Sequence, residues 1–475
     1  MKKAFILFAA ILFIACQKEK NKKQSLETLV NAKTELLDSI YTMHYKKKEF
    51  NGNVLVAENG KIVYQKSFGL AHEKDSVPLN LNTRFELASV SKQFTAVGIV
   101  LLHKEDLLSY EDDITKFIPE LSFYQGITVK NLLIHTSGLP DYMELAVNNW
   151  DKSRIATNKD IIKLFQEIKP ETHFKPDEDF EYSNTGYLLL ATIIERVSGE
   201  EFEDYLKEKI FDPLDMNNTF IYRRRFKPQV LENYAEGYFY SDSLKRKVLP
   251  DEIKQHSYIV YLDGIVGDGI INSNVYDLLK WDRALYGNKL INSEDKELIF
   301  SSYPTKNDSE TNYGFGWEIE KSKKYQTIVY HSGSWGGYIT YIERHLDNDK
   351  TIIILQNNDV EISVKKPIKN TRCVLYELSV ELPIKLSKDT LIKYAGTYLN
   401  KANQEQQIIF KEGKLWAQIS KKIRLELIPV SKTKFIVDGF SPEVTYTFSI
   451  DRNNTVDKYK VQQIETGVEE TVVRK

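Results

Sequence analysis

Ser89 and Lys92 stand three residues apart, shortly before an almost continuous apolar run from Phe94 to Leu102. In a helix this spacing places both side chains on one face. The free N–H groups of a first helical turn and the positive end of the helix dipole favour negative charge on the serine oxygen. An amine buried against apolar residues gives up its proton more easily, so Lys92 can accept the proton of Ser89. The pair predicts a nucleophilic serine with a lysine base.

The S-x-x-K spacing alone is weak evidence, because it also occurs at Ser293, Ser363 and Ser431. Those three copies lie in polar, lysine-rich surroundings, and none of them begins an apolar helix. Context therefore favours Ser89 as the candidate nucleophile. The alternative is purely structural: Ser89 caps a helix, and Lys92 extends its amine into solvent.

Two further groups of polar residues stand at the ends of predicted elements. The Y-S-N word at Tyr182 precedes an apolar helix pattern that stops at Gly199, and the H-S-G word at His331 ends a β-rich run. Y-x-N also occurs at Tyr286 and Tyr398, whereas H-x-G occurs once. A tyrosine hydroxyl can transfer a proton and an asparagine amide can hold an amine, although either residue can also be structural.

The elements that must position these residues are read from the spacing of apolar side chains. Helical spacing over Leu26 to Tyr45 predicts an amphipathic helix, and two β-rich runs meet at the turn word Asn59-Gly60. Four more β-rich runs lie between Tyr313 and Asn358, and the stretch between the two β-rich regions has helix and loop character. The sequence therefore predicts an α+β fold, an antiparallel sheet flanked by helices together with a helical subdomain. Three other helices are expected, at Lys159–Ile168, at about Asn274–Tyr286 and at about Lys366–Leu378, the last packing beside the first helix.

The N-terminus has the pattern of an export signal. Residues 1–16 combine Lys2 and Lys3 with a 12-residue apolar run and end in Ala15-Cys16. The run is too short to span a bilayer, so it predicts a signal peptide. A small residue followed by cysteine resembles a bacterial lipoprotein signal, in which Cys16 is lipidated. Residues 17–25 then form a tether, and we expect an exported lipoprotein anchored to a membrane of the cell envelope; the alternative is an ordinary secretory signal.

The rest of the chain divides into two predicted domains. Residues 26–380 carry all the candidate site residues, residues 381–389 form a polar, proline-containing linker, and residues 390–475 contain short alternating strands. The last segment is therefore predicted to be a small all-β domain. Once Cys16 has been used for lipidation, Cys373 is the only cysteine left, which excludes an internal disulfide.

Composition excludes several classes of partner. The 475 residues carry 65 basic and 67 acidic side chains, a formal net charge of −2. Such a balance of charges does not indicate a nucleic-acid partner. No His, Asp or Glu cluster has metal-ligand spacing, and we expect no cofactor. The sequence leaves the oligomeric state open.

Taken in order, Ser89-x-x-Lys92, Tyr182-x-Asn184 and His331-x-Gly333 resemble the serine hydrolases of the class C β-lactamase and penicillin-binding-protein type. The words FELASVSKQFTA, LLIHTSGLPDY, FEYSNTGY, GFGWEI and HSGSWGGY are typical of that family. The resemblance covers about residues 30–380. It implies a β-lactamase/transpeptidase-like fold.

The resemblance also implies a role for each motif residue. Ser89 would form an acyl-enzyme, Lys92 would be its base or proton relay, and Tyr182, tuned by Lys92, would be a second proton-transfer group. Asn184 would hold the lysine and the substrate amide. The oxyanion hole would consist of the N–H groups of Ser89 and Ser334. Substrate binding would involve Asn184, His331, Gly333 and Ser334, with the glycines at 333, 336 and 337 letting a substrate approach the strand; His135 and Asp141 would be structural.

Two departures from the family pattern bear on the substrate. β-Lactamases usually carry lysine where this chain has His331, which contributes positive charge only when protonated, near its ordinary pKa of about 6.5. The C-terminal β-domain is also absent from minimal β-lactamases. Both favour an esterase or peptidase acting on an ester, amide or D-amino-acid peptide, with weak β-lactamase or DD-carboxypeptidase activity at most. The alternative is a non-catalytic cell-envelope protein that binds peptidoglycan or peptide in the same groove.

Overall fold

The chain folds into two units, which the computed structural model divides after Leu375. The structure describes residues 30–359, 365–420, 423–437, 444–452, 455–463 and 467–475. The predicted signal peptide, Cys16 and the tether lie outside the described residues. Each unit has its own hydrophobic core and is described by itself below.

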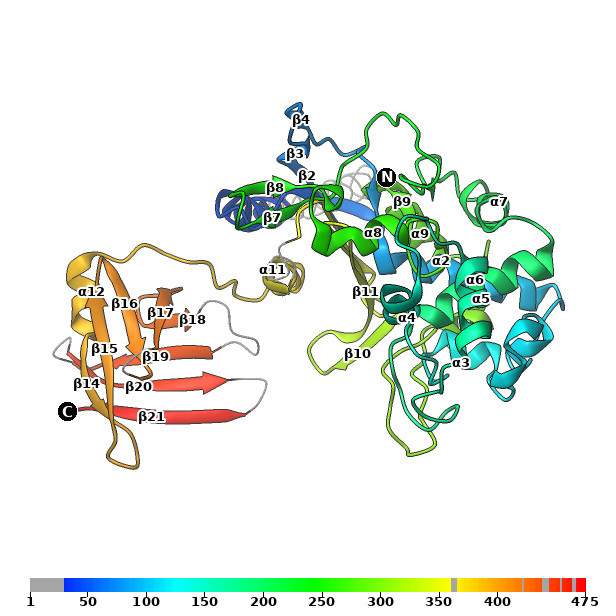
Figure 1. The fold of residues 1–475 in the computed structure, drawn as a ribbon. Coiled ribbons are helices and arrows are strands. Elements are labelled where there is room, and N and C mark those ends of the chain that lie inside the picture. Colours follow the sequence, from blue (N-terminus) through cyan, green and yellow to red (C-terminus); the bar gives the residue numbers. More distant parts are fainter. Residues whose placement is uncertain (1–29, 360–364, 421–422, 438–443, 453–454, 464–466) are drawn as a thin grey trace, which may run out of the picture. The chain divides into compact units, whose positions relative to one another are not determined.

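A six-stranded antiparallel sheet forms the centre of the first unit, in the order β10-β11-β12-β13-β1-β2 (Figure 1). The turn between β1 and β2 has positive φ at both Asn59 (50°) and Gly60 (69°), as a tight hairpin requires. In β1, Val54 lies opposite Ile354 of β13. The predicted sheet is thus confirmed, with its first and last strands side by side. The strands are β1 Gly52–Glu58, β2 Lys61–Phe68, β10 Glu318–Ser322, β11 Gln326–Trp335, β12 Tyr338–His345 and β13 Lys350–Gln356.

The run Tyr313–Ile319, which the sequence predicts as a strand, is mostly loop, and β10 begins only at Glu318. Gly316 has φ +80°, and a Cβ there would lie 2.9 Å from Cα of Gln93. The loop therefore packs directly on the start of the helix that follows Ser89. Its alternating apolar residues are buried although they form no strand ladder. The alternation therefore predicts a strand where the structure has a loop.

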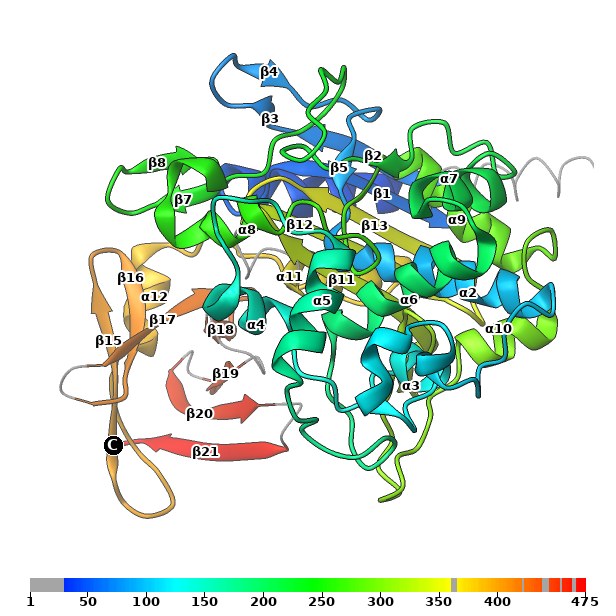
Figure 2. The same ribbon diagram turned by 45° about the vertical axis from the view of Figure 1, so that its right-hand side comes forward.

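Helices cover both faces of the sheet (Figures 1 and 2). The helix over residues 30–46 and α11 (Lys365–Leu375) lie together, and the hydroxyls of Tyr41 and Thr371 are 3.0 Å apart. This confirms the predicted packing of the last helix beside the first. Helices α2 (Lys92–Lys104) and α9 (Val275–Tyr286) belong to the core on the other face.

In the sequence, the predicted helical subdomain comes after strands β1 and β2 and before strands β10 to β13. Its longest helix, α6 (Asn184–Ser198), begins where the Ser183 hydroxyl accepts from the N–H of Gly186 and ends at Gly199, whose φ is 76°. A small sheet, β5 (Phe85–Glu86), β9 (Ile271–Ser273) and β6 (Phe220–Ile221), was not predicted, since strands of two or three residues show no alternation. The other elements of this unit are β3 Leu70–His72, β4 Val77–Pro78, α3 Val129–Leu133, α4 Tyr142–Asn149, α5 Asn158–Ile168, α7 Phe202–Leu206, β7 Phe239–Ser241, β8 Arg246–Val248, α8 Ser257–Tyr261 and α10 Ser293–Ile299.

The second unit is a closed barrel of eight antiparallel strands. Aromatic rings fill its interior: Tyr398, Phe435, Phe448 and Tyr459 are each at most 2% exposed. The predicted all-β domain is thus a barrel with a packed core. Its elements are α12 Lys388–Tyr394, β14 Gly396–Leu399, β15 Glu405–Lys411, β16 Lys414–Gln418, β17 Arg424–Pro429, β18 Lys434–Val437, β19 Val444–Ile450, β20 Val456–Gln463 and β21 Val468–Arg474.

The boundary between the units differs from the predicted one. Residues 381–389, predicted as a linker, belong to the barrel unit. Glu381 pairs with Lys434, and the N–H of Ile384 donates to the Pro429 carbonyl at 2.8 Å. A polar segment behaves as a linker only if its residues make no contacts with a neighbouring domain. Residues 381–389 contact the barrel and are therefore part of that unit.

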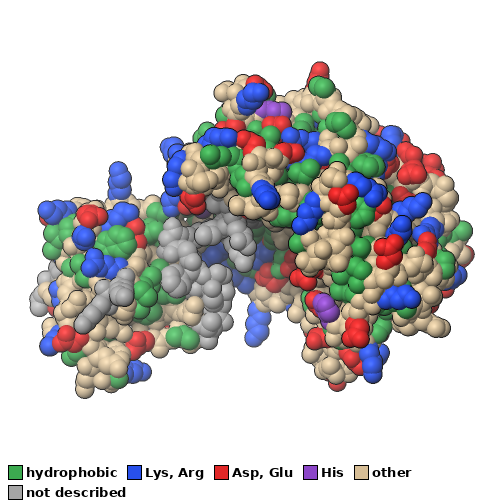
Figure 3. Space-filling model, in the orientation of Figure 1, with side chains coloured by type: hydrophobic (Ala, Val, Ile, Leu, Met, Phe, Trp, Pro, Cys, Tyr) green, Lys and Arg blue, Asp and Glu red, His purple; other side chains and the backbone are tan. Residues whose placement is uncertain are grey.

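The described surface matches the balanced composition. Figure 3 shows acidic and basic side chains interspersed over the face in view. Within the described ranges, no helix is long and apolar enough to cross a bilayer. Cys373 is buried and carries a free thiol.

Candidate active site

Ser89 lies in a short 3-10 turn, Ala88–Ser91, that leads directly into α2. The sequence predicts a helix here; the structure places the serine one turn before the α-helix proper. Ala88 has φ 49°, a costly conformation for a residue with a Cβ, so neighbouring contacts must hold it. The N–H of Leu87 donates to Ile271 of β9 at 2.8 Å, and the Thr340 hydroxyl of β12 donates to the Leu87 carbonyl at 2.6 Å. Two sheets therefore fix the turn that carries Ser89.

The amine of Lys92 is fully buried and has three polar neighbours. Its Nζ lies 3.1 Å from Ser89 Oγ, 2.9 Å from Asn184 Oδ1 and 2.8 Å from the Asp268 carbonyl oxygen. The last two atoms can only accept hydrogen bonds. A neutral amine has two N–H groups and one lone pair, so both N–H groups are used and the lone pair is left for the Ser89 hydroxyl.

Burial lowers the pKa of Lys92 to about 8, while the nearby charges of Asp268 and Asp141 act in the opposite direction. The cause is desolvation, which disfavours the ammonium form. The buried lysine that the sequence predicts is therefore present, and a large fraction of it is neutral in mildly alkaline solution.

Tyr182 lies over the same amine, with Lys92 Nζ 5.0 Å from its ring centroid. The residue is 38% exposed, but its hydroxyl is enclosed and hydrogen-bonded to the Ser89 side chain. Burial raises the pKa of this phenol well above its ordinary value, and the bond to Ser89 only partly opposes that rise. Burial thus dominates the titration of Tyr182, in place of the predicted tuning by Lys92, and the group is a phenol that can donate a proton.

Asn184 is the first residue of α6, and both ends of its amide are engaged. Oδ1 accepts from Lys92, and Nδ2 donates to Asp141 Oδ2 at 3.1 Å. Asp141 in turn caps α4 by accepting from the N–H of Met143 at 2.7 Å. The predicted contact of Asn184 with Lys92 is present, whereas its amide nitrogen is held by Asp141, so it can reach a substrate only by sharing that hydrogen bond.

His135 supports the Tyr182 loop from behind. It is fully buried, its Nδ1 accepts from the Ser183 N–H at 3.0 Å, and its ring centroid lies 4.4 Å from that of Tyr182. The structural role predicted for His135 and Asp141 agrees with these contacts.

His331 is buried in β11, one residue beyond the stretch that pairs with β10. Its Nε2 lies 2.9 Å from the Tyr313 hydroxyl and its Nδ1 lies 2.7 Å from the Ser332 carbonyl oxygen. The carbonyl can only accept, so Nδ1 carries the proton and Nε2 accepts from Tyr313. Burial and the charge of Lys92 lower the pKa of His331 to about 3. The expectation that His331 titrates near 6.5 is therefore wrong, because a buried imidazole beside an amine stays neutral.

Strand β11 presents an open edge beyond His331. Its pairing with β10 ends at Tyr330, while its pairing with β12 continues to Trp335. The unpaired side of residues 331–335 can therefore accept an extended substrate as an added strand. Ser334 lies on this edge, where its predicted oxyanion-hole N–H remains a prediction.

Gly333 packs closely against the turn that carries Ser89, and its predicted contact with a substrate stays a prediction. A Cβ at this position would lie 2.3 Å from the Leu87 carbonyl oxygen and 3.1 Å from the Ala88 Cβ. The missing side chain thus makes room for the turn that carries Ser89, and a substrate does not occupy that space. Similarly, a Cβ at Gly337 would lie 2.3 Å from the backbone nitrogen of Tyr238.

A cavity of about 470 Å³ joins these groups. Ser89, Tyr182, Asn184, His331 and Ser334 line it, with the amine of Lys92 behind Ser89. Sequence reasoning missed Asp268, whose carbonyl holds Lys92, and Tyr313, which fixes the tautomer of His331. Their only sequence signals are the glycine-rich word GIVGDGI and the word YGFGW. In the described part of the chain, no group of three or more His, Cys, Asp and Glu residues is arranged to hold a metal ion.

Comparison with known sequences agrees with this geometry. A family model described as Beta-lactamase matches residues 42–368. Penicillin-binding protein 4* of Bacillus subtilis (strain 168) is 40% identical over 465 residues, which is 96% of this chain and 99% of that protein. The putative penicillin-binding protein PbpX of the same strain is 30% identical over 304 residues, 64% of this chain and 71% of that protein.

Solved structures share the fold. The octameric penicillin-binding protein homologue from Pyrococcus abyssi has a TM-score of 0.65 at 24% identity, covering 92% of this chain and 99% of that one. The D-amino acid amidase from Ochrobactrum anthropi has a TM-score of 0.60 at 22% identity, covering 74% and 99%. At these identities the likeness concerns the fold alone.

Proposed function

This chain belongs to the beta-lactamase family of serine hydrolases, and on that premise we propose that it cleaves an ester, amide or D-amino-acid peptide bond through an acyl-enzyme on Ser89. The observation that carries the proposal is the coordination of Lys92. Two acceptors use both N–H groups of the neutral amine, and its lone pair is left for Ser89 Oγ at 3.1 Å. A binding protein would have no need for an amine buried at such cost.

In the proposed first step, Ser89 Oγ attacks the substrate carbonyl carbon while its proton passes to Lys92. Negative charge develops on the carbonyl oxygen, which the N–H groups of Ser89 and Ser334 stabilise. The bond to the leaving group then breaks as that group takes a proton from Tyr182, whose raised pKa keeps it protonated. The proton on Lys92 restores the Tyr182 hydroxyl.

In the second step, water attacks the acyl-enzyme carbonyl. Its proton passes to the Lys92–Tyr182 pair, and Ser89 leaves with a proton from the same pair. The acid product departs with the resting state restored. The two proton-transfer groups of this scheme adjoin Ser89: Lys92 Nζ lies 3.1 Å from Ser89 Oγ, and Tyr182 is hydrogen-bonded to the Ser89 side chain.

The substrate proposal rests on charge. His331 is neutral because its pKa is about 3, so it gives a substrate carboxylate no positive partner. This favours an ester, amide or D-amino-acid peptide over a β-lactam, leaving β-lactamase or DD-carboxypeptidase activity weak.

The test is covalent labelling with a fluorescent fluorophosphonate followed by intact-mass measurement. Wild type should gain one adduct, and Ser89→Ala should gain none. Ser293→Ala is the matched control, because it removes an exposed serine from another S-x-x-K word and should label like wild type. An unlabelled wild type that still binds peptidoglycan fragments would favour the non-catalytic binding protein.

We also propose that the enzyme is an exported lipoprotein of the cell envelope, anchored through Cys16 and acting on small-molecule or peptide substrates. The signal pattern of residues 1–16 supports this. Cys16→Ser should move the protein from the membrane fraction to the soluble fraction without loss of specific activity. Unchanged membrane association in that variant would contradict the anchor.

A further inference from the structure

The cavity beside Ser89 is lined on several sides by carboxyl groups. Glu86, Asp268 and Glu318 are among its lining residues, and none of the described residues that line it is arginine or lysine. The only imidazole of the lining, His331, is neutral. When ionised, these carboxyl groups disfavour a substrate anion near the scissile bond and favour a cation.

Among these carboxyl groups, Glu86 has a buried oxygen that is available to a ligand donor. It belongs to β5, three residues before Ser89, and is only 6% exposed. Its Oε1 is buried and has no hydrogen-bond partner among the described residues. A buried carboxyl oxygen without a partner is unfavourable, so a donor that hydrogen-bonds to it stabilises the site.

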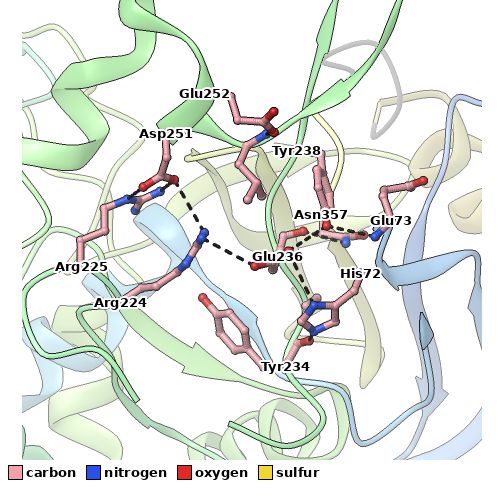
Figure 4. Close-up of polar contacts among 12 residues, drawn as sticks. His72, Glu73, Arg224, Arg225, Tyr234, Glu236, Tyr238, Asp251, Glu252 and Asn357 are labelled. Atoms are coloured by element: carbon pink, nitrogen blue, oxygen red, sulfur yellow. Dashed lines mark hydrogen bonds and ion pairs between the residues drawn. The ribbon is translucent and has the colours of Figure 1, made fainter. Parts of the chain in front are cut away.

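Arg224 and Arg225, whose charges act on Glu86, are engaged with other carboxylates, and Figure 4 shows their pairing with Asp251 and Glu236. Arg225 pairs with Asp251 at 2.7 Å and with Asp263 at 3.1 Å. Arg224 lies 3.6 Å from Glu236 and 3.8 Å from Asp251. Both guanidinium groups moderate the electrostatics around Glu86 but make no hydrogen bond with it, so no described residue donates to Oε1.

We propose that Glu86 binds a protonated amine on the acyl unit of the substrate, so that this site selects esters or amides of amino acids with a free amine. The proposal rests on the proposed function and narrows it. The positions allow it, since three residues of chain span at most about 11 Å and the acyl carbon sits at Ser89. A primary ammonium also suits the site, because it offers three donors in a compact group.

Ionisation of Glu86 should accompany binding. Burial raises the pKa of Glu86 to about 8, so the empty site is largely uncharged near pH 7. An ammonium in contact with the carboxyl lowers that pKa, and binding then releases a proton. The other groups that act on Glu86 are Asp263, Asp268, Arg224, Arg225 and the hydroxyls of Tyr234 and Tyr338.

The test uses two matched pairs of p-nitroanilides with the full-length enzyme. The first pair is D-alanyl against propionyl, and the second is Nα-acetyl-D-lysyl against Nα-acetyl-D-norleucyl; only the first member of each carries an amine. In at least one pair the amine should raise kcat/KM of wild type about 10- to 100-fold, the value of one hydrogen bond to a charged group. Glu86→Gln should abolish most of that ratio, and Glu111→Gln, which changes a largely exposed glutamate, should keep it.

A second measurement does not depend on the variant folding. Calorimetry of wild type at pH 7 with D-alaninol, which keeps the amine and has no ester or amide bond to cleave, should show proton release on binding when two buffers of different ionisation enthalpy are compared. Ratios near one in both pairs, no proton release, or a ratio that survives in folded Glu86→Gln would each overturn the proposal. If Ser89 still labels with the fluorophosphonate in these cases, the proposed hydrolase function stands; if wild type does not label, the proposed function fails first.

Discussion

Replacing Lys92 with methionine should show by how much the buried amine lowers the free energy of unfolding. Burial holds the pKa of Lys92 at about 8, below its ordinary value of 10.5. The native state therefore binds this proton more weakly than the unfolded chain does, and protonated Lys92 opposes folding. The difference of about 2.5 pH units amounts to about 3 kcal/mol at pH 6.5.

The sign of the pH dependence follows from the same shift. As the pH rises from 6.5 to 9.5, native Lys92 loses its proton while the unfolded chain keeps it, so wild type gains stability. The cost of Lys92 falls to about 1 kcal/mol at pH 9.5. Methionine does not titrate, so the advantage of Lys92→Met over wild type should shrink by about 2 kcal/mol across this range. The variant also leaves Asn184 Oδ1 and the Asp268 carbonyl without their donor, but that cost does not change with pH.

Urea unfolding followed by tryptophan fluorescence measures this difference. Trp150, Trp281, Trp317 and Trp335 lie in the first unit, so four of the five tryptophans of the chain report on it. Lys163→Met is the control, since its side chain is 72% exposed and should give no slope. A difference between Lys92→Met and wild type that is constant from pH 6.5 to 9.5 would refute the claim that native Lys92 is a depressed base.

Three other predictions concern activity. Tyr182→Phe should slow acylation, measured by stopped flow with a p-nitrophenyl ester, about 10²- to 10⁴-fold while unfolding free energy hardly changes; full turnover would make the tyrosine a wall of the cavity. The acidic limb of kcat/KM should follow Lys92 at about 8, because the free amine is the active form, and an inflection near 6.5 would contradict the neutral state of His331. Gly333→Ala should lower kcat/KM about 100-fold or more, because its Cβ pushes on the Ser89 turn, whereas Gly287→Ala, whose Cβ meets no atom closer than 3.6 Å, should keep wild-type values.

Local signals in the sequence were enough for the elements of the main sheet. Asn59-Gly60 forms the predicted hairpin turn because both residues tolerate positive φ, and the β-branched run of β13 forms a strand buried on both faces. The short strands β5, β6 and β9 could not be predicted, since their pairing depends on residues far apart in the chain. The loop at Gly316 escaped for a similar reason: only contact with the start of α2 distinguishes it from a strand.

The identities of the site residues could be predicted from the sequence, but their protonation states and hydrogen-bond partners could not. Spacing and context indicated Ser89, Lys92 and Tyr182, because those motifs depend on local sequence. The charge of His331 depends on burial and on Tyr313, which no spacing reveals. Glu86 belongs to the same sequence word as Ser89, but its unpaired oxygen becomes visible only when the surrounding elements are in place.

The pairing of β1 with β13 has a consequence for the time at which the enzyme becomes active during its synthesis. The two strands come from opposite ends of the unit, and the contact between Tyr41 and Thr371 joins residues 330 positions apart. While the chain grows, β1 has no partner on one side until β13 has been synthesised. Such long-range pairing is slow, and the unpaired strand edge is prone to aggregation. The segment with Ser89 is made long before β11, so a nascent fragment that ends before β11 holds the nucleophile without the strand edge proposed to receive the substrate. A chain stopped before residue 331 would thus have a reactive serine in its sequence and no site in which to use it.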